Sequence, residues 1–373
     1  MRIAIHAADL DHDRIDGTRV YMLSMLRNFG VLDSQDAFYV YHKNEFNPLL
    51  EPPKFSNYSI KKKPFPFMWT QTRFAFELLR NKPDVLWMPV QNIPLLRNSR
   101  MKTVVTIHDL AFKIFPQYFP TRDLAKLNRL TDNAVSRADR IIAISESTKH
   151  DLLRFYPNLE EKKIFVVHHG FDRDLFEKDI SADFSQMILE KYGIEKNKYL
   201  LYIGAIQPRK DLVTLVEAFE KIKEKNPGLK LVIAGAPAWN YEDTLKKITS
   251  SIYSGDVVVT GKTVFEEQPV LYRQAAAFVL PSLYEGFGIP VLEAMASSVP
   301  VICARNSSLV EVGAEAVRFF ETSNAEDLTE KLNEVLGSKE LREEMIRRGK
   351  ERIKEFSWEK CAQETLEVIK GLD

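Results

Sequence analysis

The sequence predicts an α/β protein made of two Rossmann-like domains, and three observations support this prediction. A chain of 373 residues is longer than one hydrophobic core usually supports, so two domains are the default. Short apolar runs that end in polar or glycine-containing turns alternate with amphipathic stretches, which is typical of parallel strands joined by helices. A second series of this kind begins at Lys198, which predicts a second α/β domain.

The composition excludes several classes of protein. The 52 basic and 52 acidic residues balance, so a polyanion such as nucleic acid is not an expected partner. The two cysteines, Cys303 and Cys361, lack metal-site spacing and indicate a reducing compartment without disulfides. No apolar run reaches the roughly 18 residues of a membrane helix. Because a strand pattern begins directly after Met1, we expect no signal peptide and a cytoplasmic protein.

Gly17 lies in the first strand-to-helix loop of the N-terminal half. We expect strands in this half at residues 2–7, 38–42, 85–88, 103–107, 140–144 and 164–167. We expect helices at residues 20–29, 70–79, 125–137 and 145–153. Such a loop can bind an anion because the first N–H groups of a helix have no partner within the helix. The alternative is a plain turn glycine.

The segment from Lys61 to Trp69 is both basic and aromatic (KKKPFPFMW). One interpretation is a peripheral membrane contact, in which aromatic rings insert and lysines meet anionic head groups. The other is a strand end that continues into a helix, with the aromatic side chains in the core. We favour the second because the two prolines interrupt any long amphipathic helix.

Histidines follow two of the predicted strands. His108 and Asp109 come just after residues 103–107, at a carboxyl end, where open α/β sheets bind ligands. Asp109 either holds the His108 tautomer or caps a turn, and the sequence leaves both open. His168 and His169 precede Asp172 and suggest a metal site. Adjacent strand residues face opposite sides, however, so we predict no metal here.

Arg209 and Lys210 lie at the first strand-to-helix turn of the second half. We expect strands there at residues 199–203, 229–234, 257–260, 277–280, 299–303 and 318–320. We expect helices at residues 212–225, 290–298, 325–336, 339–355 and from 358 onward. A guanidinium fork, a lysine charge and a helix N-terminus together make a good diphosphate clamp. The alternative is a solvated pair of charges.

Residues 276–303 predict a strand, a glycine loop, a helix and a further strand. Glu285 lies in the loop and Glu293 in the first helical turns. Carboxylates do not bind phosphate, so we interpret both as acceptors for hydroxyl groups of a ligand that carries phosphate nearby. The dinucleotide fingerprint G-x-G-x-x-G fails, because Val291 occupies its sixth position. The alternative is an ordinary tight turn with a solvated glutamate at a helix start.

The stretch EGFGIPVLEAMAS, which starts at Glu285, resembles the paired-glutamate signature of the family 4 retaining glycosyltransferases. The segments TIHDL at 106–110 and PRK at 208–210 are also similar to motifs of that family. The resemblance implies the GT-B fold, in which two Rossmann-like domains face each other across a cleft. It implies an acceptor-side domain of residues 1–172 plus 357–373, and a nucleotide-sugar-binding domain of residues 173–356.

The resemblance also implies an activity. It is the retaining transfer of a hexose, mannose or glucose, from a nucleotide-diphosphate sugar to a glycan or lipid-linked acceptor. No metal or other cofactor is expected. The alternatives are a protein that binds a nucleotide sugar without transferring it, or a GT-B hydrolase or epimerase that acts on the donor alone. The protein would be cytoplasmic or peripheral at the inner membrane face.

The family's functional residues map onto this chain position by position. The expected catalytic residues are His108, which reaches the donor sugar, Arg209 and Lys210, which hold the diphosphate, and Glu285, which holds sugar hydroxyls. Glu293 is expected to hold the ribose diol, and Val264, with Leu271, the base. The remaining expected donor-binding residues are Gly17, Gly204, Gly261, Gly286, Phe287, Gly288 and Ile289. Asp16 stands where the family often has a second glycine before Gly17.

Overall fold

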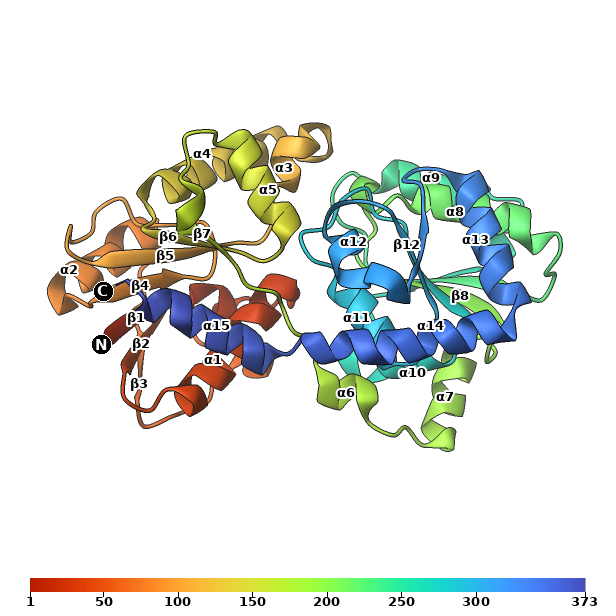
Figure 1. Ribbon diagram of the computed structural model, residues 1–373, viewed down its shortest axis with the longest axis horizontal. Coiled ribbons are helices and arrows are strands. Elements are labelled where there is room, and N and C mark those ends of the chain that lie inside the picture. Colours follow the sequence, from red (N-terminus) through yellow and green to blue (C-terminus); the bar gives the residue numbers. More distant parts are fainter. Residues whose placement is uncertain (373) are drawn as a thin grey trace. The chain divides into compact units, whose positions relative to one another are not determined.

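The computed structural model describes residues 1–372, which divide into two compact units (Figure 1). Unit 1 comprises Met1–Ile114, Thr121–Gly170 and the chain from Ser357 onward, so it is discontinuous in sequence. Unit 2 comprises Phe115–Pro120 and Phe171–Phe356. The expected domains of residues 1–172 plus 357–373 and 173–356 differ from these units at residues 115–120 and by two residues at the junction. The expected domain boundaries stay a prediction.

Unit 1 contains a seven-stranded parallel sheet in the order β3-β2-β1-β4-β5-β6-β7. The strands are β1 Arg2–His6, β2 Ala37–His42, β3 Tyr58–Lys62, β4 Val85–Met88, β5 Lys102–Ile107, β6 Arg140–Ala143 and β7 Ile164–Val166. Because all neighbours are parallel, every strand ends at the same edge of the sheet. The end of β5 therefore places His108 at that edge.

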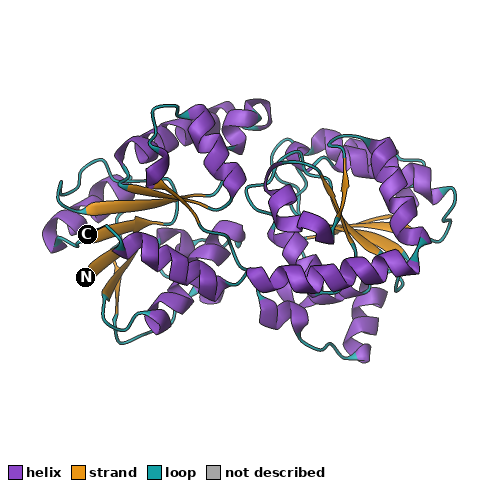
Figure 2. Cartoon of the chain, in the orientation of Figure 1, coloured by secondary structure: helices purple, strands orange, loops and turns teal. Residues whose placement is uncertain are grey.

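Helices cover both faces of the unit 1 sheet (Figure 2). They are α1 Gly17–Leu32, α2 Ala75–Asn81, α3 Ala111–Ile114, α4 Thr121–Arg137, α5 Glu146–Phe155 and α15 Trp358–Lys370. The last helix, α15, packs against α1, and both share one apolar core with β1. A Cβ on Gly170 would lie 2.1 Å from the backbone nitrogen of Trp358, so glycine permits the close approach of the chain to the start of α15.

Unit 2 contains a six-stranded parallel sheet in the order β10-β9-β8-β11-β12-β13. The strands are β8 Tyr199–Ile203, β9 Lys230–Ala234, β10 Val257–Gly261, β11 Ala277–Leu280, β12 Val301–Ala304 and β13 Arg318–Phe320. β8 and β11 are neighbours although residues 204–276 lie between them in the sequence, so the loops that follow them meet at one edge. This adjacency positions the candidate site.

The helices of unit 2 pack in two groups around its sheet (Figure 2). In one group α8 contacts α9 and α13, and in the other α11 contacts α10, α12 and α14. The bounds are α6 Arg173–Glu177, α7 Ala182–Tyr192, α8 Leu212–Lys223, α9 Glu242–Ser250, α10 Gln268–Arg273, α11 Ile289–Ala296, α12 Ser307–Gly313, α13 Ala325–Gly337 and α14 Lys339–Arg352.

The segment from Lys61 to Trp69 differs from the interpretation that we favoured. Trp69 is buried, but Phe65 and Phe67 are 40% and 66% exposed, so placing all these aromatic rings in the core was wrong. The Trp69 indole donates to the carbonyl of Lys63 (2.7 Å) and its ring stacks on Phe74. This contact closes the loop, so the residues between Lys63 and Trp69 project outward.

Candidate active site

The loop between β11 and α11 carries Glu285, the first glutamate of the EGFGIPVLE stretch. Gly288 adopts a φ of 113° directly before α11 begins. This backbone conformation favours glycine, and a Cβ at Gly288 would also lie 2.9 Å from a methyl carbon of Leu309, which would have to shift. Glu285 precedes this turn, and Glu293 follows in the second turn of α11. Both carboxylates are thus positioned by one strand–turn–helix unit.

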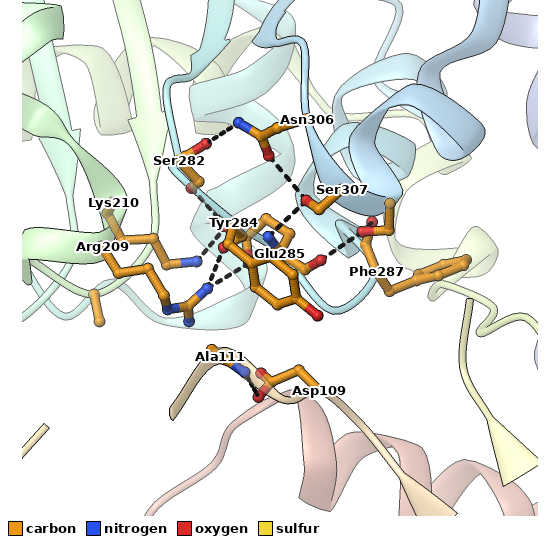
Figure 3. A network of polar contacts seen from close by, with 12 residues as sticks. Asp109, Ala111, Arg209, Lys210, Ser282, Tyr284, Glu285, Phe287, Asn306 and Ser307 are labelled. Atoms are coloured by element: carbon orange, nitrogen blue, oxygen red, sulfur yellow. Dashed lines mark hydrogen bonds and ion pairs between the residues drawn. The ribbon is translucent and has the colours of Figure 1, made fainter. Parts of the chain in front are cut away.

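Glu285 is buried and lies among positive charges (Figure 3). The Lys210 ammonium contacts Oε1, a nitrogen of Arg209 lies 3.5 Å from Oε2, and the Ser282 hydroxyl donates to Oε1 (2.6 Å). Burial alone would raise the pKa of Glu285. The charges of Lys210 and Arg209, with hydrogen bonds from Lys210 and Ser282, outweigh it and lower the pKa to about 2. Glu285 is therefore an anion at every physiological pH.

Polar side chains at the start of α12 hold the backbone of the Glu285 loop (Figure 3). The Glu285 N–H donates to the hydroxyl oxygen of Ser307 (3.0 Å), which itself donates to Asn306 (2.9 Å). The Ser308 hydroxyl lies 2.8 Å from the carbonyl oxygen of Glu285 and 2.7 Å from that of Phe287. Sequence reasoning missed these three residues. A signal existed, because they follow β12, the strand next to β11, at the same sheet edge.

Arg209 and Lys210 lie in a short 3₁₀ turn, Pro208–Lys210, between β8 and α8. The Arg209 guanidinium donates to the Tyr284 carbonyl, and the Arg209 carbonyl accepts from the N–H of Leu283 (2.9 Å). The loops after β8 and β11 are thus bound to each other through both backbone and side chain. The side chains of Arg209 and Lys210 are only 13% and 14% exposed, and partial burial strengthens their field.

Glu293 contacts a neutral hydroxyl group, whereas Glu285 contacts two cations. Its Oε2 accepts a hydrogen bond from the hydroxyl of Tyr272 (2.9 Å), a completely buried residue of α10. Burial raises the pKa of Glu293 to about 7; the Tyr272 hydrogen bond lowers it in part, and the charge of Asp172 adds to the rise. Near neutral pH the Glu293 carboxyl therefore exists in both protonation states. Tyr272 is a site residue that sequence reasoning missed.

The other predicted base and phosphate residues of unit 2 lie at or beyond the ends of its strands: Gly204 directly after β8, Gly261 as the last residue of β10, Val264 shortly after it and Leu271 in α10. Gly204 has a φ of 155°, which L side chains rarely adopt, and a Cβ there would lie 2.7 Å from the Tyr202 hydroxyl oxygen, which would have to shift. Gly261 has φ of 70° and open space around it. Val264 is 54% exposed. Leu271 is completely buried in α10, so the expectation that it lines an open pocket was wrong.

Within the glycine loop the backbone, and not the aromatic side chain, is suited to contact a ligand. The Phe287 side chain is 3% exposed, and its ring centroid lies 5.8 Å from that of Phe356. Gly286 is buried and Ile289 is half-buried at the first position of α11. The peptide groups from Gly286 to Ile289 thus remain candidates for donor contacts.

Gly17 is the first residue of α1 and is exposed. Asp16 caps the helix: its side chain accepts from the N–H of Arg19 (3.3 Å) and forms an ion pair with the Arg19 guanidinium (2.5 Å). A carboxylate therefore already occupies the position that an anion would take at this helix N-terminus. This geometry opposes phosphate binding at Gly17.

His108 is held by the backbone, which answers the question about Asp109. The Nε2 atom lies 2.8 Å from the carbonyl oxygen of Pro89, while Asp109 accepts from the N–H of Ala111 (3.1 Å) and so caps a turn. Burial lowers the pKa of His108, which keeps the ring neutral. A carbonyl can only accept, so Nε2 carries the proton and Nδ1 is a hydrogen-bond acceptor.

His169 belongs to an aromatic cluster in unit 1. Its ring stacks on Tyr21, with centroids 4.7 Å apart and planes at 25°, and lies 5.5 Å from the ring of His108. Burial, followed by the nearby His108 and His168, lowers the pKa of His169. Across residues 1–372 no three His, Cys, Asp or Glu side chains are arranged to hold a metal ion. Among the same residues no helix is long and apolar enough to span a bilayer.

Two family models match the chain, one in each half. "Glycosyltransferase Family 4" matches residues 34–175 and "Glycosyl transferases group 1" matches residues 185–352. The O-antigen chain mannosyltransferase B of Escherichia coli is 28% identical over 272 residues, which are 73% of this chain and 71% of that protein. The alpha-maltose-1-phosphate synthase of Mycolicibacterium smegmatis is 29% identical over 255 residues, 64% of each chain.

Solved structures agree on the fold. Anabaena HepE in complex with UDP and glucose aligns with a TM-score of 0.76 at 15% identity, over 100% of both chains. WaaG, a glycosyltransferase of lipopolysaccharide biosynthesis, aligns with a TM-score of 0.75 at 15% identity, over 99% of this chain and 100% of WaaG. The predicted α/β fold of two Rossmann-like domains, the predicted family and the predicted enzyme class are confirmed. The chain belongs to the group 1, family 4 glycosyltransferases and has the GT-B fold.

Proposed function

We propose that this glycosyltransferase retains anomeric configuration, works without a metal ion, and moves mannose or glucose from a nucleotide-diphosphate sugar to a glycan or lipid-linked acceptor. The observation that carries the proposal is the cluster in which Arg209 and Lys210 flank the Glu285 carboxylate at the carboxyl edge of β8 and β11. The mannosyltransferase name of one relative supports mannose, and the UDP and glucose bound by HepE support a nucleoside diphosphate donor.

The charges of the cluster suit departure of the leaving group. When the bond between the anomeric carbon and the phosphate oxygen breaks, about two negative charges develop on the diphosphate. A cation at 4 Å contributes about 4 kcal/mol at an effective dielectric near 20. Preferential stabilisation of the transition state by about 1.36 kcal/mol raises the rate tenfold. Arg209 and Lys210 together therefore have enough charge to take the place of a metal ion.

Glu285 has two successive roles in this proposal. Without donor it neutralises the two cations, so that burying them costs less than burying them unpaired. When the diphosphate binds, Arg209 and Lys210 form ion pairs with the diphosphate instead of with Glu285. Ser282 keeps its hydrogen bond to the Glu285 carboxylate. The carboxylate oxygens then accept from hydroxyl groups of the sugar.

The remaining predicted residues, apart from Gly17 and Leu271, bind the rest of the donor. The Nδ1 atom of His108 accepts a hydrogen bond from a sugar hydroxyl group, and the Glu293 carboxylate accepts hydrogen bonds from the ribose diol. The loops at Gly204 and Gly261, with Val264, lie beside the base and the phosphates. The backbone from Gly286 to Ile289, including Phe287 and Gly288, contacts the sugar.

Retention requires the new bond to form on the face that the leaving group departs from, or else two inversions. We propose front-face attack, in which the acceptor oxygen bonds to the anomeric carbon and its proton passes to the leaving phosphate oxygen. Glu285 is committed to hydroxyl groups and does not act as a nucleophile. The test is to incubate the Glu285→Gln variant and the unaltered enzyme with donor and to search by mass spectrometry for a glycosyl-enzyme. An adduct on either protein contradicts front-face attack.

The deciding experiment measures nucleotide release from a panel of donors with uracil and guanine bases, with and without acceptor glycans and with a chelator. Release that depends on acceptor and persists in the chelator supports the proposal. Release without acceptor indicates a donor hydrolase or epimerase, and binding without release indicates a sensor. Loss of turnover on chelation, restored by a divalent cation, contradicts metal independence.

A further inference from the structure

Seven large apolar side chains of unit 1 are exposed on two neighbouring segments, residues 65–79 and 95–96. They are 40% to 68% exposed: Phe65, Phe67, Met68, Phe76, Leu79, Leu95 and Leu96. We call them the apolar face. Single exposed apolar residues are ordinary on protein surfaces, whereas a group of this size marks an interaction surface.

Hydrogen bonds bring the members of the apolar face together around the start of one helix. The Thr72 hydroxyl contacts the carbonyl oxygens of Phe67 (2.9 Å) and Met68 (3.1 Å). Phe76 follows Thr72 by four residues, so the two share a helix face. Gln71 accepts from the N–H of Leu95 (2.8 Å), which places the second segment beside the same helix. That helix begins as a π-helical turn at Thr70–Phe74 and continues as α2 (Figure 1).

The segment that carries most of this apolar face is rich in positive charge. Residues 61–82 contain six basic residues and a single acidic one, Glu77, in a chain whose net charge is zero. Glu77 is 2% exposed and pairs with Arg73 (2.7 Å) and Lys63 (3.8 Å), so its charge is compensated locally. Burial, then repulsion from Lys63 and attraction by Glu77, with further repulsion from Arg80, leaves the pKa of Lys61 lowered. The basic side chains are therefore close enough to act on one another.

We propose that the apolar face docks on an anionic lipid bilayer, with Phe67, Met68 and Phe76 entering the boundary between head groups and acyl chains. The surrounding lysines and arginines then meet acidic head groups, and the two contributions add. The charge favours this occupant: residues 61–82 stay net positive after the ion pairs with Glu45 and Glu77, so a second copy of the same segment repels it, whereas an anionic bilayer attracts it. Trp69, which a sequence reading would choose as the anchor, is buried and does not take part.

Membrane docking goes beyond the proposed function, because it depends on neither the sugar nor the transfer step. The test is co-sedimentation of the full chain, without donor, with phosphatidylcholine vesicles and with vesicles that also contain phosphatidylglycerol. We expect binding to the anionic vesicles only, weakening as salt is raised. The double variant Phe67→Ser with Phe76→Ser should bind at least tenfold more weakly, and Arg80→Glu at least fivefold more weakly.

The matched control is Ile252→Ser, which removes an 80% exposed apolar side chain from unit 2 and should leave binding unchanged. Thermal unfolding checks that all variants remain folded. Equal binding to neutral and anionic vesicles, or undiminished binding by the double variant, overturns the proposal. So does a sedimentation velocity result in which the unaltered chain is a dimer and the double variant a monomer, since the face is then a self-interface. None of these outcomes bears on the transferase assignment.

Discussion

Glu285 and Glu293 stand eight residues apart on one strand–turn–helix unit, yet their surroundings move the two pKa values in opposite directions. Burial opposes ionisation of both carboxyls. Two cations and a serine hydroxyl outweigh burial at Glu285 and lower its pKa to about 2. At Glu293 the main hydrogen-bond partner is the neutral hydroxyl of Tyr272, and burial wins, with a pKa of about 7.

The difference shows that the two members of a paired-glutamate motif need not do the same chemistry. Glu285 is an anion at physiological pH, and in the proposed mechanism its two cations pass to the incoming diphosphate. Glu293 can gain or lose a proton near neutrality at little cost. Changes that remove the cations, the carboxylates or the tyrosine hydroxyl should therefore have separable effects, and they test the comparison from both sides.

Removing a cation from the Glu285 side should have the largest effect. We expect Lys210→Ala to lower kcat/KM about a thousandfold, because a charge worth about 4 kcal/mol at 4 Å is lost from the developing diphosphate. Steady-state kinetics with the donor found by the release assay measures this. Lys196→Ala, which removes an exposed lysine of the same unit, is the control. A loss of less than tenfold contradicts the proposed role of Lys210.

Neutralising each glutamate in turn should separate binding from turnover. Glu285→Gln no longer competes with the diphosphate for Arg209 and Lys210, so we expect nucleoside diphosphate to bind several-fold more tightly while kcat falls about a hundredfold. Glu293→Gln should weaken nucleotide binding about tenfold, through loss of a charged hydrogen bond to the ribose. Calorimetric titration with the nucleoside diphosphate measures both. Weaker binding by Glu285→Gln contradicts the competition argument.

The pH dependence of nucleotide binding should report Glu293. With a pKa of about 7, its ionised fraction rises from about one tenth at pH 6 to about nine tenths at pH 8, so affinity should rise up to about tenfold over this range. Glu293→Gln removes this dependence. Because a phosphate group also titrates near pH 6, a 2′,3′-dideoxynucleotide serves as the control ligand and should show only the phosphate contribution. Equal profiles for the two ligands contradict the role of Glu293.

The same pKa values affect stability with opposite sign. The folded-state pKa of Glu293 is raised, so its contribution to the free energy of unfolding is present below about pH 4.5 and is lost as pH rises towards 7. The folded-state pKa of Glu285 is lowered, so its contribution to the free energy of unfolding is present above about pH 4.5 and is lost as pH falls towards 2. We therefore compare the change in melting temperature that Glu293→Gln causes at pH 8 with the change that it causes at pH 4. The change at pH 8 should be more positive by a few degrees.

Local pattern was enough to predict every strand except β3, together with the turn at Gly288 and the helix that follows it, because apolar runs and glycine turns are properties of adjacent residues. The contact between Lys210 and Glu285 was not predictable in this way. It depends on β8 and β11 being neighbours in the sheet, which no local pattern specifies. The exposure of Phe67 escaped for a similar reason, since a hydrogen bond from Trp69 to Lys63 turns that loop outward.

Tyr272→Phe should have the smallest effect and is the most selective probe of the Glu293 side. The Tyr272 hydroxyl lowers the pKa of Glu293 against the larger effect of burial, so its removal should raise that pKa further. Nucleotide affinity at pH 7 should fall a few-fold, and the whole pH profile should move to higher pH, so that affinity recovers at pH 8.5. A purely structural role for Tyr272 would weaken binding equally at every pH. That result would show that the hydroxyl fills space in α10 and does not position the Glu293 carboxylate.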